Sequence, residues 1–353
     1  MQRLLMKGNE AIAEAAIKAG CRHFFGYPIT PQNEVCAYMS RRMPQVEGVF
    51  LQAESEIAAI SMVLGASAAG ARAMTSSSSP GISLKTEGLS YIAGSDLPAL
   101  IVNVQRGGPG LGTIQPAQSD YNQATKAPGH GDLRLLVFAP STVQEMVDCV
   151  FETFDLTEKY RMPGMLLCDG LLGQMMEPVI FPEVEVTPSE KPWALTGHGD
   201  KRQPNIITSL NLDPELSQSA NLARFERYAE IEKTQARAES LMTEDADIVV
   251  VAYGACARIA RSAVSAARAE GIKAGMLRPI TVWPFPTQQI LAAGKSAKAL
   301  LAVEMSMGQM VHDVRTAVQF KKPVHFFGRT GGVVPTPNEV LEQLKIIDGG
   351  LKA

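Results

Sequence analysis

The stretch Phe24-Phe25-Gly26-Tyr27-Pro28-Ile29-Thr30-Pro31-Gln32-Asn33-Glu34 gives the first indication of the fold. Gly26 leaves the backbone free, whereas Pro28 and Pro31 restrict it on either side of Thr30. Because proline is a typical first residue of a helix, we expect Pro31 to begin one and Thr30 to be its N-cap. The pattern predicts a strand that turns into a helix.

A turn of this kind presents a hydroxyl group and free backbone N–H groups at the end of a strand. A carboxylate or another anion can bind there. An ordinary turn with a capping threonine explains the same residues, and this stretch alone does not distinguish the two interpretations.

Strands and helices alternate outward from this turn. We expect strands at residues 23–25, 49–52, 71–75, 97–104, 135–138 and 165–168, and helices at 8–20, 35–39, 53–70, 82–93 and 141–159. A second series has strands at 247–254, 273–277, 299–304 and 323–327, and helices at 256–270 and 308–319. The alternation predicts the α/β class, with two doubly wound domains whose parallel sheets are covered on both faces.

The composition changes between the two series. Residues 178–214 are rich in Pro, Glu, Thr and Lys and show little periodicity, and residues 220–239 read as a charged, exposed helix. Prolines bound residues 277–286, which we expect to form a stiff connection. The predicted division is a first α/β domain at 1–178, a linker and exposed helix at 179–240, and a second α/β domain at 241–353.

The composition also argues against several classes of protein. The 353 residues are 46% hydrophobic and 20% charged, with a net charge of −3, so no basic stripe is available for nucleic acid or a membrane surface. No apolar run approaches the roughly 18 residues that span a bilayer. Because no charged-then-apolar signal follows Met1, we expect a cytoplasmic protein.

The five cysteines lie far apart and form no Cys-x-x-Cys pair. A zinc ribbon or an iron–sulfur cluster held by this chain alone is therefore not expected, and the usage is typical of a reducing compartment. The cysteines are Cys21, Cys36, Cys149, Cys168 and Cys256.

Two acidic residues begin the predicted helix at 53–70. Glu54 and Glu56 stand where the helix dipole favours negative charge, and for Glu54 this effect is sufficient explanation. The rest of the helix is small and apolar all round, which predicts a buried helix that another chain or domain can approach closely. A buried carboxyl group at Glu56 would have a raised pKa and could share a proton with a ligand nitrogen.

Polar residues also follow two other predicted strands. The hydroxyl-rich turn at 76–81 can bind an anion, although serine and glycine also form ordinary turns. Arg106 follows the strand at 97–104, and the glycines at 107–110 would let a carboxylate approach it; a surface arginine paired with an acid is the alternative. His130 lies in a glycine-rich loop, where it could serve acid–base chemistry or simply be solvated.

Together these segments resemble a known family, the 2-oxoacid:ferredoxin oxidoreductases, which use thiamine diphosphate and coenzyme A. The resemblance covers nearly the full chain, whose length is similar to that of the separate α-type subunit. The second domain looks like the transketolase C-terminal domain, and residues 129–132 and 169–178 look most like the branched-chain (3-methyl-2-oxobutanoate) type. The motifs are Gly26-Tyr27-Pro28-Ile29-Thr30-Pro31, Glu54-Ser55-Glu56-Ile57-Ala58-Ala59, Thr75-Ser76-Ser77-Ser78-Ser79-Pro80-Gly81, Arg106-Gly107-Gly108-Pro109-Gly110, Leu277-Arg278-Pro279-Ile280 and Pro284-Phe285-Pro286.

The resemblance implies that the first domain is of the pyrimidine-binding type and gives its residues roles. Glu56 matches the carboxyl that hydrogen-bonds the aminopyrimidine of thiamine diphosphate and so supports its proton transfer. Thr30 and Arg106 match positions that hold the substrate carboxylate in register. The other residues expected at the site are Ser78, Ser79 and Gly81 for the cofactor and Pro28 and Ile29 for the substrate.

One departure from the family pattern implies a divided site. Thiamine enzymes hold magnesium with a Gly-Asp-Gly motif followed by Asn, but here Cys168-Asp169-Gly170 is followed by Leu171. We therefore expect a β-type partner subunit to supply the diphosphate and Mg²⁺ site. The resemblance further implies iron–sulfur clusters on a ferredoxin-like subunit, a γ-type subunit, ferredoxin as electron acceptor, and a chain that is inactive alone.

Three alternatives remain open. The chain could be the corresponding 2-oxoglutarate or pyruvate subunit, and Lys85 could be the extra cation that a 2-oxoglutarate tail would need, or it could simply be solvated. It could also be a catalytically silent scaffold with this fold. A nucleotide-binding role is discouraged because the glycine fingerprint is absent.

Overall fold

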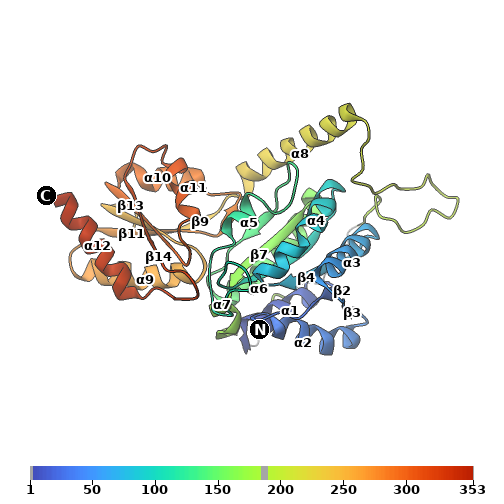
Figure 1. Ribbon diagram of the computed structural model, residues 1–353, viewed down its shortest axis with the longest axis horizontal. Helices are drawn as coiled ribbons and strands as arrows, with labels where there is room; N and C mark the ends of the chain where they lie inside the picture. The colour runs from blue at the N-terminus through green and yellow to red at the C-terminus, as the bar shows by residue number, and fades with distance from the viewer. Residues whose placement is uncertain (1–2, 184–189, 353) are drawn as a thin grey trace.

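The computed structural model describes residues 3–183 and 190–352, which form two α/β units side by side (Figure 1). The first unit is built on a seven-stranded sheet with the order β12-β6-β7-β5-β4-β2-β3. Strands β2 to β7 run parallel, and β12 is an antiparallel edge strand. The strands are β2 (His23–Gly26), β3 (Val49–Gln52), β4 (Ala73–Ser77), β5 (Ala99–Gln105), β6 (Leu136–Phe138), β7 (Pro163–Asp169) and β12 (Thr281–Trp283).

Helices cover both faces of this sheet because right-handed crossovers in opposite directions place helices on opposite faces. Helix α1 packs between α2 and α6 on one face, and α3 packs against α4 on the other. The central strands β4, β5 and β7 are buried at every residue, as expected for a parallel sheet covered on both sides. The helices are α1 (Gly8–Lys18), α2 (Asn33–Arg42), the 3₁₀ turn η1 (Met43–Val46), α3 (Glu56–Ala68), α4 (Ser79–Gly94), α5 (Tyr121–Thr125), α6 (Val143–Tyr160) and α7 (Gly170–Gln174).

The second unit is built on a five-stranded sheet with the order β14-β13-β10-β11-β9. Only β9 runs antiparallel to its neighbour. Helix α9 packs against α12, and α10 packs against α11. The elements are β9 (Ala238–Leu241), β10 (Ile248–Val251), α9 (Gly254–Ala269), β11 (Ala274–Pro279), α10 (Thr287–Ser296), β13 (Ala299–Glu304), α11 (Met310–Ala317), β14 (Val324–Gly328) and α12 (Pro337–Lys352).

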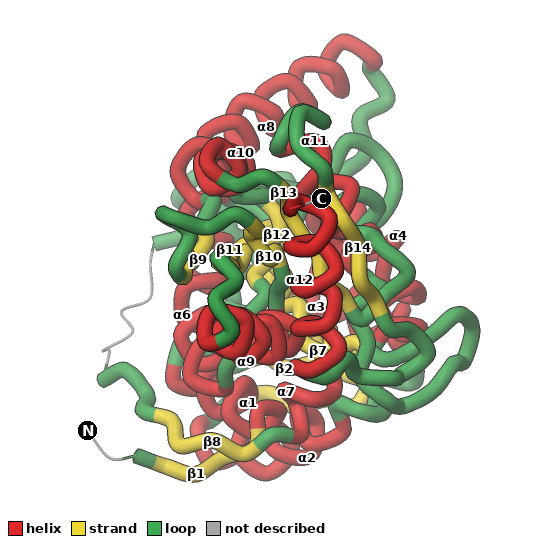
Figure 2. Tube along the Cα trace, turned by 90° about the vertical axis from the view of Figure 1, so that its left-hand side faces the viewer, coloured by secondary structure: helices red, strands yellow, loops and turns green. Residues whose placement is uncertain are grey.

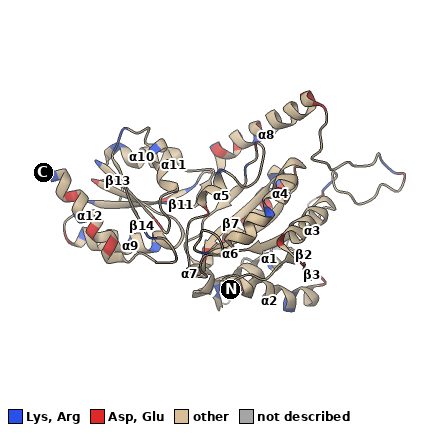
Figure 3. Cartoon of the chain, viewed as in Figure 1, with Lys and Arg blue, Asp and Glu red and all other residues tan. Residues whose placement is uncertain are grey.

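Two peripheral features complete the structure. Strands β1 (Leu4–Lys7) and β8 (Met176–Val179) pair antiparallel near the N-terminus, as Figure 2 shows. Helix α8 (Pro214–Gln235) projects from the first unit, and only Tyr228 and Ile231 on it are fully buried. Figure 3 shows residues of both charge signs distributed over both units.

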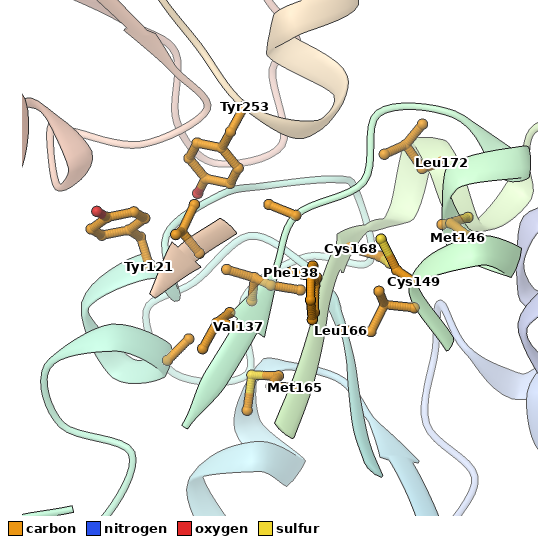
Figure 4. Packing of buried hydrophobic residues seen from close by; sticks show 14 of the residues in the cluster. Tyr121, Val137, Phe138, Met146, Cys149, Met165, Leu166, Cys168, Leu172 and Tyr253 are labelled. Carbon is orange, nitrogen blue, oxygen red and sulfur yellow. The ribbon is translucent and has the colours of Figure 1, made fainter. Parts of the chain in front are cut away.

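The two units share a packed interface. Strand β12 leaves the second unit to pair with β6 of the first. Tyr121 and Tyr253 face each other across the interface with ring centroids 5.8 Å apart (Figure 4). Gln118 donates from Nε2 to the Tyr253 carbonyl at 2.8 Å and accepts from the Met305 N–H at 3.1 Å. Hydrogen bonds between side chains and backbone therefore fix the first unit against the second.

The structure differs from several sequence expectations. Helix α2 begins at Asn33 with Gln32 at the N-cap, so the prediction of a Thr30 cap was wrong. Residues 277–286 contain the end of β11 and all of β12 instead of only a connection. Helix α3 is not buried all round, because the side chain of Ile57 is 52% exposed and Ser61 and Gly65 are exposed on the same side. An apolar composition does not reveal that one face of the helix lacks a covering element within the described part of the chain.

The predicted domain boundaries stay a proposal. Strand β9 crosses the expected boundary at residue 240, and β12 joins the first sheet although it lies in the C-terminal third of the chain. Part of the expected linker, residues 184–189, lies outside the described residues.

Candidate active site

The predicted site residues gather where the connections of the first sheet diverge. After β2 the chain passes to α2 on one face, whereas after the neighbouring strand β4 it passes to α4 on the other. Such a divergence opens a crevice at the carboxyl ends of the strands, which is where open α/β sheets bind ligands. Thr30 follows β2, Glu56 follows β3, Ser78 follows β4 and Arg106 follows β5.

Glu56 is the first residue of α3. The helix is capped by Ser55, whose hydroxyl group accepts from the Ala58 N–H at 3.2 Å. The Glu56 side chain is only 6% exposed. Within residues 3–183 and 190–352, no hydrogen-bond donor or cation contacts its carboxylate, which therefore keeps its acceptor positions for a ligand that presents N–H groups.

Gly81 and Ser77 form a polar cradle beside Glu56. A Cβ atom at Gly81 would lie 2.1 Å from Ser77 Oγ and 2.6 Å from Glu56 Oε1, so the glycine leaves space that any side chain would fill. The hydroxyl groups of Ser77 and Ser78 are buried and have no hydrogen-bond partner within the described part of the chain. The unpartnered hydroxyl group of Ser77 next to a free carboxylate indicates a site for a polar ligand.

Arg106 brings two loops together. Its side chain is 6% exposed, and its guanidinium group donates to the Thr30 carbonyl at 2.9 Å and to the Leu111 carbonyl at 3.0 Å. The Nε–H is buried and has no hydrogen-bond partner among residues 3–183 and 190–352. The surface-arginine interpretation is therefore wrong, because Arg106 is buried and bonds to backbone carbonyls instead of an acid. The free Nε–H and the remaining N–H groups can still donate to an anion.

The hydroxyl groups of Thr30 and Ser79 have separate partners. Thr30 Oγ1 accepts from Asn33 Nδ2 at 3.2 Å. Ser79 Oγ accepts from the Arg106 backbone N–H at 3.0 Å and donates to the Asp120 carboxylate at 2.6 Å. These bonds join the start of α4 to the Arg106 loop.

Asp120 was missed by the sequence reasoning. Burial raises the pKa of this carboxyl group, and hydrogen bonds from Ser79 and Asn103 oppose the rise. The sequence does contain an indication of a buried polar partner here, because Asn103 and Gln105 are polar residues at alternating positions of a fully buried strand. Gln105 Oε1 accepts from the Asp120 backbone N–H at 3.1 Å, so both polar side chains of β5 hold Asp120.

Other predicted residues lie at the margin or away from the crevice. Pro28 is exposed and Ile29 is half-buried in the loop after β2. The His130 N–H donates to Ser90 Oγ, and its ring meets Tyr91 edge-on at 6.1 Å. His130 therefore lies at the C-terminal end of α4, whereas Gly81 lies at the N-terminal end. Lys85 is fully buried, so neither a solvated lysine nor a group open to a substrate tail describes it.

The described residues contain no cluster of three or more His, Cys, Asp or Glu side chains that could hold a metal ion. None of the helices in this part of the chain is long and apolar enough to cross a membrane.

Comparisons with known proteins place these observations in a family. Residues 14–249 match the profile described as "Pyruvate flavodoxin/ferredoxin oxidoreductase, thiamine diP-bdg", and residues 246–340 match "Pyruvate:ferredoxin oxidoreductase core domain II". The chain is 49% identical to the ketoisovalerate oxidoreductase subunit VorB of Methanothermobacter thermautotrophicus, over 99% of both chains. It is 37% identical to the 2-oxoglutarate synthase subunit KorA of the same organism, over 97% of this chain and 98% of the relative.

The fold of the chain is similar to that of a solved structure. The 2-oxoglutarate:ferredoxin oxidoreductase from Magnetococcus marinus, which has 2-oxoglutarate, coenzyme A and succinyl-CoA bound, superposes with a TM-score of 0.88 and 29% sequence identity. The match covers 98% of this chain and 65% of that chain. The prediction of two doubly wound α/β domains is confirmed.

Proposed function

The chain belongs to the 2-oxoacid:ferredoxin oxidoreductase family, and we propose that it supplies the pyrimidine and substrate-carboxylate half of the active site in an enzyme that converts a branched-chain 2-oxoacid to its acyl-CoA. The proposed substrate is 3-methyl-2-oxobutanoate. The observation that carries the proposal is the free, buried carboxylate of Glu56 beside the space at Gly81.

The residues around Glu56 fit the aminopyrimidine ring of thiamine diphosphate. The carboxylate can accept an N–H from the ring, and the unpartnered hydroxyl groups of Ser77 and Ser78 can bond to its other polar atoms. The cradle at Gly81 lets a flat ring lie against the carboxylate. When bound, thiamine diphosphate supplies the nucleophilic carbon and the electron sink for decarboxylation. Glu56 holds the ring proton that this chemistry requires.

Arg106 and Thr30 would orient the substrate. Arg106 already fixes the loop after β2 through the Thr30 carbonyl, and its buried Nε–H remains available to a carboxylate. An anchored carboxylate holds the 2-oxo carbon in one position, and such positioning is a large part of catalysis. Pro28 and Ile29, on the same loop, would border the substrate side chain.

We propose that partner subunits hold the diphosphate, Mg²⁺ and the iron–sulfur clusters. Ile57, Leu84 and Tyr91 are 52%, 49% and 42% exposed on α3 and α4, which pack against each other. We propose that these exposed side chains contact the β-type subunit next to Glu56. A ferredoxin-like subunit, a γ-type subunit, coenzyme A and ferredoxin would complete the reaction.

The branched-chain assignment rests on two observations. Identity is higher to the ketoisovalerate subunit, at 49%, than to the 2-oxoglutarate subunit, at 37%. Lys85, considered as a partner for the second carboxylate of 2-oxoglutarate, is fully buried and donates a hydrogen bond to a backbone carbonyl.

The five cysteines are all free and buried, which supports the proposal that the protein functions in a reducing cytoplasm.

The test is an anaerobic assay of the chain alone and of the chain co-expressed with its neighbouring subunits. Thiamine diphosphate, Mg²⁺, coenzyme A and a 2-oxoacid are supplied, and reduction of a low-potential dye is followed. We expect turnover only in the assembled complex, fastest with 3-methyl-2-oxobutanoate. Preference for 2-oxoglutarate would change the substrate, and turnover by the isolated chain would refute the divided site.

A matched pair of variants separates the enzyme from the scaffold alternative. Glu56→Gln should abolish most turnover in a complex that still assembles, because the amide cannot hold the ring proton. Glu54→Gln removes an exposed carboxylate two residues away and should retain turnover. Full activity of the Glu56→Gln complex would favour the scaffold.

A further inference from the structure

Lys85 is a buried cation that the proposed chemistry does not use. It lies in the second turn of α4, and its side chain is 0% exposed. Its Nζ donates to the backbone carbonyl of Glu56 at 3.4 Å. Within residues 3–183 and 190–352, no carboxylate lies within ion-pair distance of Nζ. A lysine in this situation is unusual, because a buried ammonium group normally has an anionic partner.

The charged groups around Lys85 indicate which residue it interacts with. Burial lowers the pKa of Lys85 to about 8, while the opposite charge on the nearby Glu56 side chain, and to a smaller extent Cys36, raises it. Glu56 and Cys36 are the titratable groups that face it, from α3 and α2. The positive end of the α3 dipole repels a cation, so the dipole does not explain a lysine here. The Glu56 carboxylate remains as the group that balances its charge.

We propose that Lys85 is a positioning residue for Glu56: it anchors the first turn of α3 through the Glu56 carbonyl and balances the charge of the carboxylate. The inference rests on the proposed function, because it concerns how the cofactor-binding carboxylate is held. The contact that Lys85 makes is with the backbone carbonyl of Glu56, so this role does not require it to touch substrate or cofactor. Loss of its charge would release the carboxylate from the position that receives the pyrimidine ring.

A double-mutant cycle tests the coupling without any activity. The full chain is unfolded with urea as wild type, Lys85→Met, Glu56→Gln and the double variant. Glu56→Gln leaves Lys85 without its balancing charge, whereas the double variant removes both charges. We expect the folding equilibrium constant of the double variant to exceed the value from independent effects by at least 10-fold. Effects that multiply independently within 2-fold would overturn the proposal.

Cofactor binding provides the second readout. The dissociation constant of thiamine diphosphate is measured in the assembled complex, with saturating Mg²⁺, from pH 6.5 to 9.5. We expect Lys85→Met to raise it about 10-fold at pH 7. The wild-type affinity should weaken above about pH 8, where Lys85 loses its proton, and the affinity of Lys85→Met should lack this step. Lys126→Met, which removes an exposed cation paired with Asp313, is the matched control and should behave as wild type.

The outcomes separate this inference from the proposed function. If Glu56→Gln binds thiamine diphosphate as tightly as wild type, the proposed function fails. If Glu56→Gln loses binding but Lys85→Met binds as wild type with the same pH profile, the function stands and the role of Lys85 is refuted. Should Lys85→Met fail to fold, the pH profile of the wild-type complex decides, since a flat affinity across pH 8 contradicts the proposal.

Discussion

Replacement of Gly81 by alanine tests the proposed cofactor cradle most directly. The new Cβ atom would lie 2.1 Å from Ser77 Oγ and 2.6 Å from Glu56 Oε1. To reach an ordinary contact of 3.4 Å, these oxygens would have to move by about 1.3 Å and 0.8 Å, the differences 3.4 − 2.1 and 3.4 − 2.6. Ser77 can rotate its hydroxyl group, but the Glu56 carboxylate must leave the position that faces the crevice.

The expected cost has two parts. Overpacking of this size typically destabilises a protein by about 1–3 kcal/mol, and alanine returns up to about 1 kcal/mol because it favours a helix over glycine. The net loss of folding stability should therefore be about 0–3 kcal/mol by these figures. A displaced carboxylate loses a charged hydrogen bond to the cofactor, worth about 1.5–3 kcal/mol, which corresponds to roughly 10- to 150-fold weaker binding.

Two measurements separate these effects. Urea unfolding of the chain gives the stability, and titration of the assembled complex with thiamine diphosphate gives the affinity. Gly349→Ala is the matched control, because Gly349 lies in helix α12 and a Cβ there meets no atom within 4 Å. It should stabilise the chain by up to about 1 kcal/mol and leave the affinity unchanged. If Gly81→Ala binds thiamine diphosphate as wild type does, the cradle beside Glu56 is not the pyrimidine site.

Three further predictions follow from the site and its buried charges. Arg106→Lys keeps the charge but cannot hold the Thr30 and Leu111 carbonyls together. We therefore expect kcat/KM for 3-methyl-2-oxobutanoate in the complex to fall about 10- to 100-fold. An unchanged kcat/KM would contradict the anchoring role. Because the pKa of Lys85 falls from 10.5 to about 8 on folding, the unfolded chain binds more protons than the folded chain between about pH 8 and 10.5. The free energy of unfolding, measured with urea, should therefore rise by about 3 kcal/mol between about pH 8 and 10.5, and Lys85→Met should lack this rise. Burial raises the pKa of Asp169 from 3.8 to about 6, so this carboxyl group contributes about 3 kcal/mol of stability that is fully present below pH 3.8 and is lost as pH rises to about 6. Asp169→Asn should flatten that part of the stability profile. An unchanged profile would show that Asp169 does not titrate there.

Strong local patterns predicted most of the fold. Strands β3 and β13 occur at the expected residues, 49–52 and 299–304, because both are short apolar runs between turns. Strand β1 was not predicted, since its pairing with β8 joins Leu4 to Val179 and leaves no local signal. Strand β12 was missed for the same reason, because its partner β6 lies far away in the sequence. Edge strands of this kind are specified by tertiary contacts.

The sequence predicted some but not all of the polar residues around the crevice. Glu56 stands out because it begins the helix that follows β3, and Arg106 because it directly follows β5. Lys85 was predicted to be solvated or to face a substrate tail, but it is buried. Helix α4 starts at Ser79, three residues before the predicted start, and the sequence does not show which face of that helix packs against α3. The polar residues Asn103 and Gln105 inside a buried strand could have indicated Asp120, since a buried amide needs a partner.

Helix α3 suggests why the enzyme should depend on assembly. Glu56 and Ile57 are consecutive residues of its first turn, yet Glu56 is 6% exposed and Ile57 is 52% exposed. Consecutive helical residues point about 100° apart, so one turn presents the carboxylate to the crevice and an apolar side chain to the outside. A subunit that covers Ile57 must therefore approach the same turn that holds Glu56. We infer that docking of the partner would both close the cofactor site and stabilise the carboxylate within it, which is the physical reason to expect turnover only from the complex.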